Sequence, residues 1–394
     1  MKYCILIVDG AADWPIAERD NKTCLELART PNMDTMATQS LIGMTKTVPD
    51  GMEASSACAC MSILGYDPIT YYRGRAGIEA KSMGIPLYDG EVFFRCNLVN
   101  IADGIMKSYS AGAITDNEAH AIMATLQSKL GSDEVQFYPG VSYRNIVKIK
   151  AHTETLGAIC TPPHDISDQP TASYLPHNSG SQYLLDLMDK AKPILEKHPV
   201  NIERTKRGDL PATDIWLFWG SGQSPQMPPF KQQYGLNCAI TSGVDLLKGL
   251  GKLSSMDILE IPGVKDDGSN DYQAQAAGGI KALDDHDMVI IHVEAPDEAG
   301  HEGDLDGKIE AIEKIDQLMV NQLLSYDKDE LRVLIMPDHP TPVEIKTHRG
   351  DPVPFMIWDS GESNGANRFT EVQAQATGLM VESGYDMMSK LIAR

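Results

Sequence analysis

The chain has 394 residues, of which 34 are basic and 55 acidic, so its formal net charge is −21. Hydrophobic residues make up 42% and charged residues 23%, a globular composition that excludes disorder as the main state. A surface this negative repels phosphate backbones and anionic lipids, and no apolar stretch approaches the roughly 20 residues of a membrane span. We therefore expect neither a nucleic-acid nor a membrane partner.

The cysteines indicate the compartment. There are seven, they are scattered, and none forms a Cys-x-x-Cys pair, which argues against a disulfide framework and for a reducing environment. The first apolar segment, Met1–Val8, is too short for a secretory signal and leads directly into Asp9. We therefore expect a cytoplasmic protein, and the sequence leaves its oligomeric state open.

Five short, wholly apolar runs predict buried strands, because they lack the alternation of polar and apolar residues that marks a half-exposed strand. They are Ile5–Val8, Ile215–Phe218, Met288–Ile291, Val333–Met336 and Phe355–Trp358. Amphipathic stretches separate them. Between Lys308 and Leu324, for example, apolar residues recur at three- and four-residue steps, as on one face of a helix. This order predicts an α/β fold with a mostly parallel sheet and helices on both faces.

The segment 88–165 has a different pattern. Its apolar runs are shorter and more alternating, and one helical stretch lies near residues 116–130. This pattern is typical of a small α+β module with a half-exposed sheet. We interpret it as an insertion, so the predicted domains are a discontinuous core of residues 1–87 and 166–394 and an inserted domain of residues 88–165.

Acidic residues and histidines gather where the predicted strands end. Because the carboxyl ends of parallel strands meet at one edge of a sheet, we expect these side chains to converge. Three carboxylates and three imidazoles could hold two divalent ions, and Zn²⁺ or Mn²⁺ suits that mixture better than Ca²⁺. An aspartate after a strand can equally be a helix cap. The candidate ligands are Asp9, Asp297, His301, Asp338, His339 and His348.

A tract of small residues, Ala54–Cys60, precedes Met61–Leu64. Such a tract can open a helix and present a hydroxyl at its amino terminus, where backbone amides and the helix dipole favour a phosphoryl group. The alternative is close packing of a small-residue helix against the sheet. Cys58 and Cys60 could be thiol ligands or packing residues.

Seven motifs follow one another along the chain, within a region of resemblance that runs from residue 3 to about residue 360. They are Ile7-Val-Asp-Gly10, Ser62-Ile-Leu-Gly-Tyr-Asp-Pro68, Tyr72-Arg-Gly-Arg75, Thr161-Pro-Pro-His-Asp165, Ala295-Pro-Asp-Glu-Ala-Gly-His301, Pro337-Asp-His339, and Thr347-His348 followed by Pro352-Val-Pro-Phe355. In order and spacing they resemble the archaeal-type cofactor-independent, or 2,3-bisphosphoglycerate-independent, phosphoglycerate mutases. That family belongs to the alkaline phosphatase superfamily of metalloenzymes.

The resemblance implies an activity and a role for each matching residue. The activity is the glycolytic interconversion of 3-phosphoglycerate and 2-phosphoglycerate through a phosphoserine at a two-metal site, with Mn²⁺ expected and Zn²⁺, Co²⁺ or Mg²⁺ as alternatives. The nucleophilic serine falls on Ser56. One metal would be held by Asp9, Ser56, Asp338 and His339, and the other by Asp297, His301 and His348. The inserted domain would cover the substrate, which would be bound by Arg75, Arg95, Arg144, His164 and Asp165.

The sequence departs from the family pattern near the nucleophile. Where the family usually reads Gly-Ser-Asp-Thr-Ala-Asn, this chain reads Ser55-Ser-Ala-Cys-Ala-Cys60. Where members often carry an arginine after a strand of the main domain, it reads Leu217-Phe-Trp-Gly220. Related bacterial proteins with such small residues have been proposed to act as homoserine kinases. The alternatives are therefore a homoserine kinase-like phosphotransferase, a metal-dependent phosphomonoesterase, or a metal-stabilised scaffold without turnover.

Overall fold

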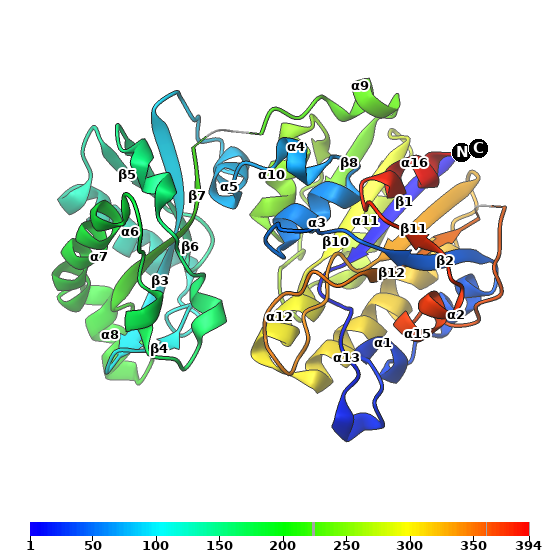
Figure 1. Cartoon of the computed structure of the whole chain (residues 1–394), viewed down its shortest axis with the longest axis horizontal. Helices are drawn as coiled ribbons and strands as arrows, with labels where there is room; N and C mark the ends of the chain where they lie inside the picture. The colour runs from blue at the N-terminus through cyan, green and yellow to red at the C-terminus, as the bar shows by residue number, and fades with distance from the viewer. Residues whose placement is uncertain (223–224, 360, 394) are drawn as a thin grey trace. The chain divides into compact units, whose positions relative to one another are not determined.

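The chain forms two compact units in the computed structural model, which describes residues 1–222, 225–359 and 361–393. Unit 1 comprises Met1–Tyr72 and Gln226–Arg394, and unit 2 comprises Arg73–Pro225 (Figure 1). The second unit therefore begins earlier and ends later than the inserted domain predicted at residues 88–165. The difference arises because flanking segments pack on the second sheet rather than on the first.

Unit 1 is built on one eight-stranded sheet. Five of its seven strand pairings are parallel: β11 with β1, β1 with β10, β10 with β8, β8 with β9, and β13 with β2. In sheet order the strands are β13 (Met380–Val381), β2 (Ser40–Thr45), β12 (Val353–Trp358), β11 (Leu331–Met336), β1 (Lys2–Val8), β10 (Met288–Val293), β8 (Cys238–Thr241) and β9 (Asp257–Ile258). The predicted α/β class with a mostly parallel sheet is confirmed.

Helices cover both faces of this sheet. On one face, Leu6 and Val8 of β1 pack in a core with Ile312 and Ile315, while α3, α10 and α16 pack together over the other face (Figure 1). No helix in the described ranges is long and apolar enough to cross a bilayer. The α-helices of unit 1 are α1 (Cys24–Leu27), α2 (Pro31–Ala37), α3 (Ser56–Ile63), α4 (Pro68–Tyr71), α9 (Phe230–Tyr234), α10 (Asp245–Leu253), α11 (Tyr272–Ala282), α12 (Ala295–Glu302), α13 (Leu305–Ile315), α14 (Asn321–Leu324), α15 (Glu371–Ala376) and α16 (Asp386–Ile392).

Two details of unit 1 differ from the simplest expectation. The strand β12 runs antiparallel to both of its neighbours, β11 and β2. The helical stretch predicted between Lys308 and Leu324 is helical throughout, but a π-helical turn at Asp316–Val320 separates α13 from α14. At that turn the buried Asp316 carboxylate accepts hydrogen bonds from the backbone amides of Asn32 and Met33, at the start of α2.

Unit 2 contains a five-stranded antiparallel sheet. The long central strand β3 pairs antiparallel with β4, β6 and β7, and β5 pairs with β6. Its elements are α5 (Arg75–Ser82), β3 (Glu91–Ala102), β4 (Ile105–Ser108), α6 (Asp116–Leu130), β5 (Val135–Tyr138), β6 (Arg144–Lys150), α7 (Ser181–Glu196), α8 (Pro199–Arg207) and β7 (Asp214–Ser221).

The apolar run Ile215–Phe218 was predicted as a strand of the main sheet, and this is wrong. It lies in β7 and pairs antiparallel with β3 of unit 2. The expected half-exposed sheet also differs, because ten consecutive residues of β3 are buried. Helix α5 covers the second face, where its Ala76 and Ala80 pack against Phe93. A strand buried on both faces has no alternation of polar and apolar residues, whether its neighbours are parallel or antiparallel. The sequence of β7 therefore has the continuous apolar pattern that is typical of a parallel strand.

Candidate active site

Three neighbouring strands deliver most of the candidate ligands. In the order β11, β1, β10, all three run parallel, so their carboxyl ends lie at one edge of the sheet. Asp9 directly follows β1, Asp338 and His339 lie two and three residues beyond β11, and Asp297 lies in the first turn of α12 after β10. The sheet order therefore explains why residues more than 300 positions apart in the sequence meet.

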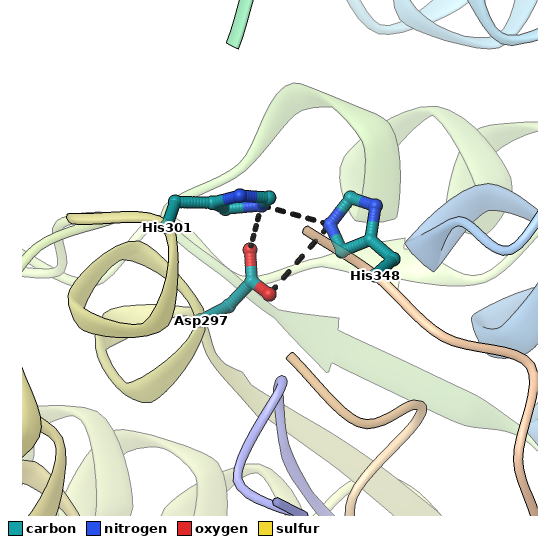
Figure 2. Close-up of side chains that lie close together, drawn as sticks. All are labelled: Asp297, His301 and His348. Atoms are coloured by element: carbon teal, nitrogen blue, oxygen red, sulfur yellow. Dashed lines mark hydrogen bonds and ion pairs between the residues drawn. The ribbon is translucent and has the colours of Figure 1, made fainter. Parts of the chain in front are cut away.

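The first set of converging side chains, the Asp297 group, comprises Asp297, His301 and His348 (Figure 2). Asp297 and His301 are four residues apart on α12, which places them on one helical face, and His348 comes from the loop before β12. His301 Nε2 lies 3.2 Å from Asp297 Oδ2 and 2.9 Å from His348 Nε2, and His348 Nε2 lies 3.6 Å from Asp297 Oδ1. Two imidazole nitrogens and a carboxylate thus face one point.

The other ring nitrogen of His301 fixes its orientation. Nδ1 donates a hydrogen bond to the Lys346 carbonyl oxygen, 3.0 Å away, so Nε2 is the ring nitrogen directed at the group. Burial alone would lower the pKa of His301, but the neighbouring Asp297 carboxylate outweighs it and raises that pKa to about 9. Burial likewise opposes ionisation of Asp297, yet His301 and His348 hold the Asp297 pKa well below its usual range.

The second set, the Asp9 group, comprises Asp9, Asp338 and His339, all buried. His339 Nε2 lies 3.3 Å from Asp338 Oδ2 and 3.6 Å from Asp9 Oδ1. The backbone amides of Gly10 and His339 donate to Asp338 Oδ1, at 3.1 and 2.8 Å, which fixes this carboxylate. Asp9 Oδ1 is buried and accepts no hydrogen bond within the described part of the chain.

The titration of this group reflects the crowding of negative charge. Burial and the nearby carboxylates of Asp338, Glu294 and Asp297 raise the pKa of Asp9 well above its usual value. Burial lowers the pKa of His339 to about 4, so the ring is neutral at pH 7. Carboxylates packed this closely in a dry site are disfavoured unless a positive charge is added.

Thr341 links the two groups, and the sequence analysis missed it. Its hydroxyl donates to Asp297 Oδ1 and lies 3.2 Å from His339 Nδ1. Because the hydroxyl proton goes to the carboxylate, the threonine oxygen accepts from His339 Nδ1–H. The His339 Nε2 atom is then unprotonated and available as an acceptor or ligand. The position of Thr341, two residues after the Asp338-His339 pair, was the available signal.

Ser56 is the hydroxyl that faces the Asp9 group. It is the first residue of α3, and its Oγ lies 3.2 Å from His339 Nε2. Two nearby hydroxyls that could compete for the role of nucleophile are already engaged, since Thr47 donates to the Asp338 carbonyl and Ser62 donates to the Thr47 carbonyl. Ser55 is the N-cap residue, with an extended backbone, and its side chain makes no capping hydrogen bond.

Cys60 and Cys58 differ in their surroundings. The thiol of Cys60 donates to Asp338 Oδ2 across 3.5 Å, and burial raises its pKa well above the usual value. Burial raises the pKa of Cys58 to about 12. Both cysteines are therefore protonated thiols, and only Cys60 touches a candidate ligand.

The donor set fits divalent cations. Each group offers nitrogen and oxygen atoms that lie within 4.8 Å of one another. The carboxylates are buried, and the second ring nitrogens of His301 and His339 are hydrogen-bonded. A mixture of imidazole and carboxylate donors suits Zn²⁺, Mn²⁺ and related ions, whereas Ca²⁺ requires six or more oxygens. The unpaired Asp9 Oδ1 is a further oxygen donor suited to a cation.

The predicted substrate-binding arginines lie in unit 2, where Glu79 joins two of them. Arg95 Nη1 donates to both Glu79 oxygens, and Arg75 Nε donates to Glu79 Oε1 at 2.9 Å. All three side chains are buried. Burial opposes the charge on Glu79, but the two guanidinium groups outweigh it and lower the pKa of this carboxyl. Glu79 was not identified from the sequence. It lies four residues after Arg75, the last residue of one of the motifs, and this spacing was the available signal.

Aromatic rings connect the other predicted residues of this cluster. The Arg75 guanidinium lies 4.1 Å from the centre of the Trp219 ring, and the His164 ring lies 5.4 Å from that ring. Arg144 lies over Tyr143 at 4.5 Å. His164 also lies 3.9 Å from the carboxylate of Asp165. The Tyr109 ring lies between them, 5.7 Å from Tyr143 and 6.2 Å from His164, so the structure brings the five predicted residues into one cationic and aromatic cluster of unit 2.

Comparison with known proteins identifies the family. The family model described as 2,3-bisphosphoglycerate-independent phosphoglycerate mutase matches residues 37–201. A relative of that name from Methanosarcina barkeri is 45% identical over 399 residues, which covers 100% of this chain and 99% of the relative. The chain belongs to the 2,3-bisphosphoglycerate-independent phosphoglycerate mutase family. The resemblance recognised in the sequence motifs is therefore confirmed.

Solved structures of similar proteins agree with this membership. A protein from Pyrococcus horikoshii superposes with a TM-score of 0.80 at 27% identity, covering 99% of this chain and 96% of that one. A cofactor-independent phosphoglycerate mutase from Thermoplasma acidophilum superposes with a TM-score of 0.59 at 25% identity, covering 100% and 99%. The fold of this phosphoglycerate mutase family member is thus shared along its whole length.

Gly10 lies so close to Asp297 that a side chain at this position would collide with the Asp297 group. Its φ is +61°, and a Cβ there would lie 2.5 Å from Asp297 Oδ1. We expect Gly10→Ala to lower the free energy of unfolding by about 2–4 kcal/mol, combining left-handed strain with overpacking. It should also weaken metal binding, because Asp297 must move. Urea denaturation and metal titration measure the two effects.

Gly51 offers a matched control for this phosphoglycerate mutase family member. Its φ is +80°, but a Cβ there would meet no atom within 4 Å. Gly51→Ala should therefore show only the left-handed strain, about 1–2 kcal/mol, with unchanged metal affinity. Equal effects of the two substitutions would contradict the close contact between Gly10 and Asp297.

Proposed function

We propose that the protein interconverts 3-phosphoglycerate and 2-phosphoglycerate by way of a phosphoserine at Ser56. The observation that carries this proposal is the placement of Ser56 Oγ 3.2 Å from His339 Nε2, at the first turn of α3 and beside the Asp9 group. A helix amino terminus favours an anionic phosphoryl group, because its backbone amides lack partners within the helix. Membership of the mutase family supports the same reaction.

The proposal includes two divalent cations, with Mn²⁺ expected. Asp9, Asp338, His339 and Ser56 would hold one, and the Asp297 group would hold the other. When bound, the cations would neutralise the dianionic phosphoryl group and lower the pKa of the Ser56 hydroxyl. Both groups supply mixed nitrogen and oxygen donors, which supports Mn²⁺, Co²⁺ or Zn²⁺ over Ca²⁺.

The proposed reaction has two transfers. Ser56 Oγ forms a bond to phosphorus while the bond between phosphorus and O3 of the substrate breaks. The glycerate O2 then attacks the same phosphorus and releases Ser56. The proton lost by Ser56 in the first transfer is balanced by the proton that O3 gains, and the second transfer reverses this exchange. Turnover therefore consumes neither water nor a second substrate.

We also propose that unit 2 binds and covers the substrate during turnover. Its cluster carries three guanidinium groups, on Arg75, Arg95 and Arg144, and two carboxylates, on Glu79 and Asp165. A net positive cluster with planar guanidinium groups suits the carboxylate and phosphate of phosphoglycerate. Exclusion of water by this unit would prevent hydrolysis of the phosphoserine. The seven free thiols support a cytoplasmic location.

The test is a direct assay of two substrates. The Mn²⁺-loaded protein is given 3-phosphoglycerate with enolase as coupling enzyme, and in parallel homoserine with ATP. We expect activity in the first assay alone. Phosphorylation of homoserine without mutase activity would favour the kinase alternative. Release of inorganic phosphate alone would indicate a phosphomonoesterase, and bound metal without any turnover would indicate a scaffold.

Arg144 provides a test of the substrate cluster. We expect Arg144→Ala to raise the KM for 3-phosphoglycerate about ten- to a hundred-fold, the usual effect of losing a charged hydrogen bond. Release of inorganic phosphate should increase at the same time, because a loosely held glycerate lets water compete. Both quantities come from the coupled assay and a phosphate assay.

The matched control is Arg207, an exposed arginine of the same unit that pairs with Glu118 and Asp209. Arg207→Ala should leave both KM and phosphate release unchanged. If Arg144→Ala behaves like Arg207→Ala, the assignment of this cluster to the substrate is wrong.

A further inference from the structure

A buried histidine behind the Asp9 group has no role in the proposed reaction. His292 lies within the apolar strand β10, and its side chain is inaccessible to solvent. Its Nε2 lies 2.6 Å from Asp9 Oδ2, and its Nδ1 lies 2.9 Å from Ser242 Oγ. The three side chains form a chain of contacts, Ser242 to His292 to Asp9, that leads to a candidate metal ligand.

The surroundings of Ser242 determine the direction of these hydrogen bonds. Ser242 Oγ accepts a hydrogen bond from the backbone amide of Val244 at 3.0 Å. Within the described part of the chain, His292 Nδ1 is the one remaining hydrogen-bonding partner of this hydroxyl, which is itself buried. The hydroxyl proton is therefore directed at Nδ1, since a buried donor without an acceptor is costly.

This direction fixes the tautomer of His292. When Nδ1 accepts from Ser242, the ring proton of neutral His292 is on Nε2, where it donates to Asp9 Oδ2. Asp9 Oδ1 is then the carboxylate oxygen that faces His339, whose Nε2 lies 3.6 Å away. The two oxygens of Asp9 thus have different tasks: Oδ2 is held from behind, and Oδ1 is presented to the site.

We propose that His292 is a positioning residue for the metal ligand Asp9, and that Ser242 sets its tautomer. His292 acts through Asp9 and does not touch the substrate. Hydrogen-bonding partners behind a metal ligand orient that ligand and increase the affinity of the site for the metal. The inference rests on the proposed metal site, but it is independent of which phosphorylated substrate the protein uses.

A different role for His292 is a ligand of a third cation. Asp9, His292 and Glu294 also place donor atoms within 4.8 Å of one another, and Glu294 Oε2 lies 3.6 Å from His292 Nε2. A ligating Nε2 must be unprotonated, whereas the positioning role requires a proton on that atom. The two roles therefore predict opposite tautomers and different metal stoichiometries.

The test combines three variants with metal binding measured without substrate. His292→Leu removes the hydrogen-bond donor to Asp9. We expect the affinity of the Asp9 group for Mn²⁺ to fall about 10- to 100-fold, measured by competition with a chelator. His292→Gln, whose amide can still donate to Asp9, should retain most of the affinity. Ser242→Ala should fall between them. As a control, His198→Gln changes a buried histidine of unit 2 and should have no effect.

Long-range ¹H–¹⁵N correlation spectra of histidine-labelled, metal-free protein report the tautomer directly. The signals that disappear in His292→Gln are assigned to His292. We expect Nε2–H with unprotonated Nδ1, and two Mn²⁺ ions per chain. Protonated Nδ1, three bound ions with one lost in His292→Leu, or equal affinities in the Leu and Gln variants would each overturn the proposal. A parent protein that binds no metal but shows the expected tautomer would instead contradict the proposed two-metal function.

Discussion

Ser56→Ala is expected to abolish phosphoryl transfer while leaving metal binding largely intact. Removal of a catalytic serine costs about 10⁶-fold in rate in enzymes that form a covalent intermediate, and a methyl group cannot accept phosphorus. Metal binding should persist, because the other ligands come from the segments that follow β1 and β11, from α12 and from the loop before β12 rather than from α3. The coupled assay gives the rate, and metal content is measured on the same sample.

The neighbouring hydroxyls make this prediction specific. Ser55→Ala should cost far less, because adjacent side chains at a helix start point in different directions and Ser56 is the one 3.2 Å from His339 Nε2. Mass spectrometry after a brief reaction with isotopically labelled phosphoglycerate locates the phosphoserine. A label on Ser55, or turnover retained by Ser56→Ala, would mean that the nucleophile is misassigned.

The sequence predicted the main sheet well, because a strand that is buried on both faces is recognisable from its continuous run of apolar residues. Strands such as β1, β10 and β11 are central, parallel and covered by helices, so their sequences are continuous apolar runs. The same pattern misled the prediction at β7. That strand is buried between α5 and the other helices of unit 2, and apolarity alone reports burial rather than the direction or identity of the neighbouring strand.

The candidate site could be predicted only in part. Asp9, Asp297 and Asp338 each follow an apolar strand, and a rule about strand ends is sufficient to group them. Thr341, His292 and Glu79 depend instead on which atoms meet in three dimensions: a hydroxyl between two groups, a ring behind a carboxylate, and a carboxylate between two arginines. Hydrogen bonds between residues distant in the chain leave no periodic pattern in a single sequence.

Removal of the bound cations is expected to abolish activity completely, and Mn²⁺, Co²⁺ or Zn²⁺ should restore it. Without cations, the carboxylates of Asp9, Asp338 and Asp297 would repel a dianionic phosphate at short range. Dialysis against chelator followed by the coupled assay tests this, with metal content measured by mass spectrometry. Full turnover of a metal-free sample would exclude the two-metal mechanism.

The affinity of the Asp297 group for a metal ion should rise with pH, and this rise tests whether His301 is one of the ligands. Because the pKa of His301 is raised to about 9, its imidazole carries a proton below that pH in the metal-free protein, and a cation must displace it. Affinity at this group should therefore rise with pH, by about tenfold per unit for one displaced proton, and level off above about pH 9.

His301→Ala separates this effect from the rest of the site. The variant should lose one ion selectively and also lose the His301-dependent rise in affinity, while the Asp9 group retains its ion. The reason is that His301 contributes its Nε2 to the Asp297 group alone, with its Nδ1 bonded to the Lys346 carbonyl. If both ions were lost together, the two groups would form one coupled site rather than two, and Thr341, which touches both Asp297 and His339, would be the residue to change next.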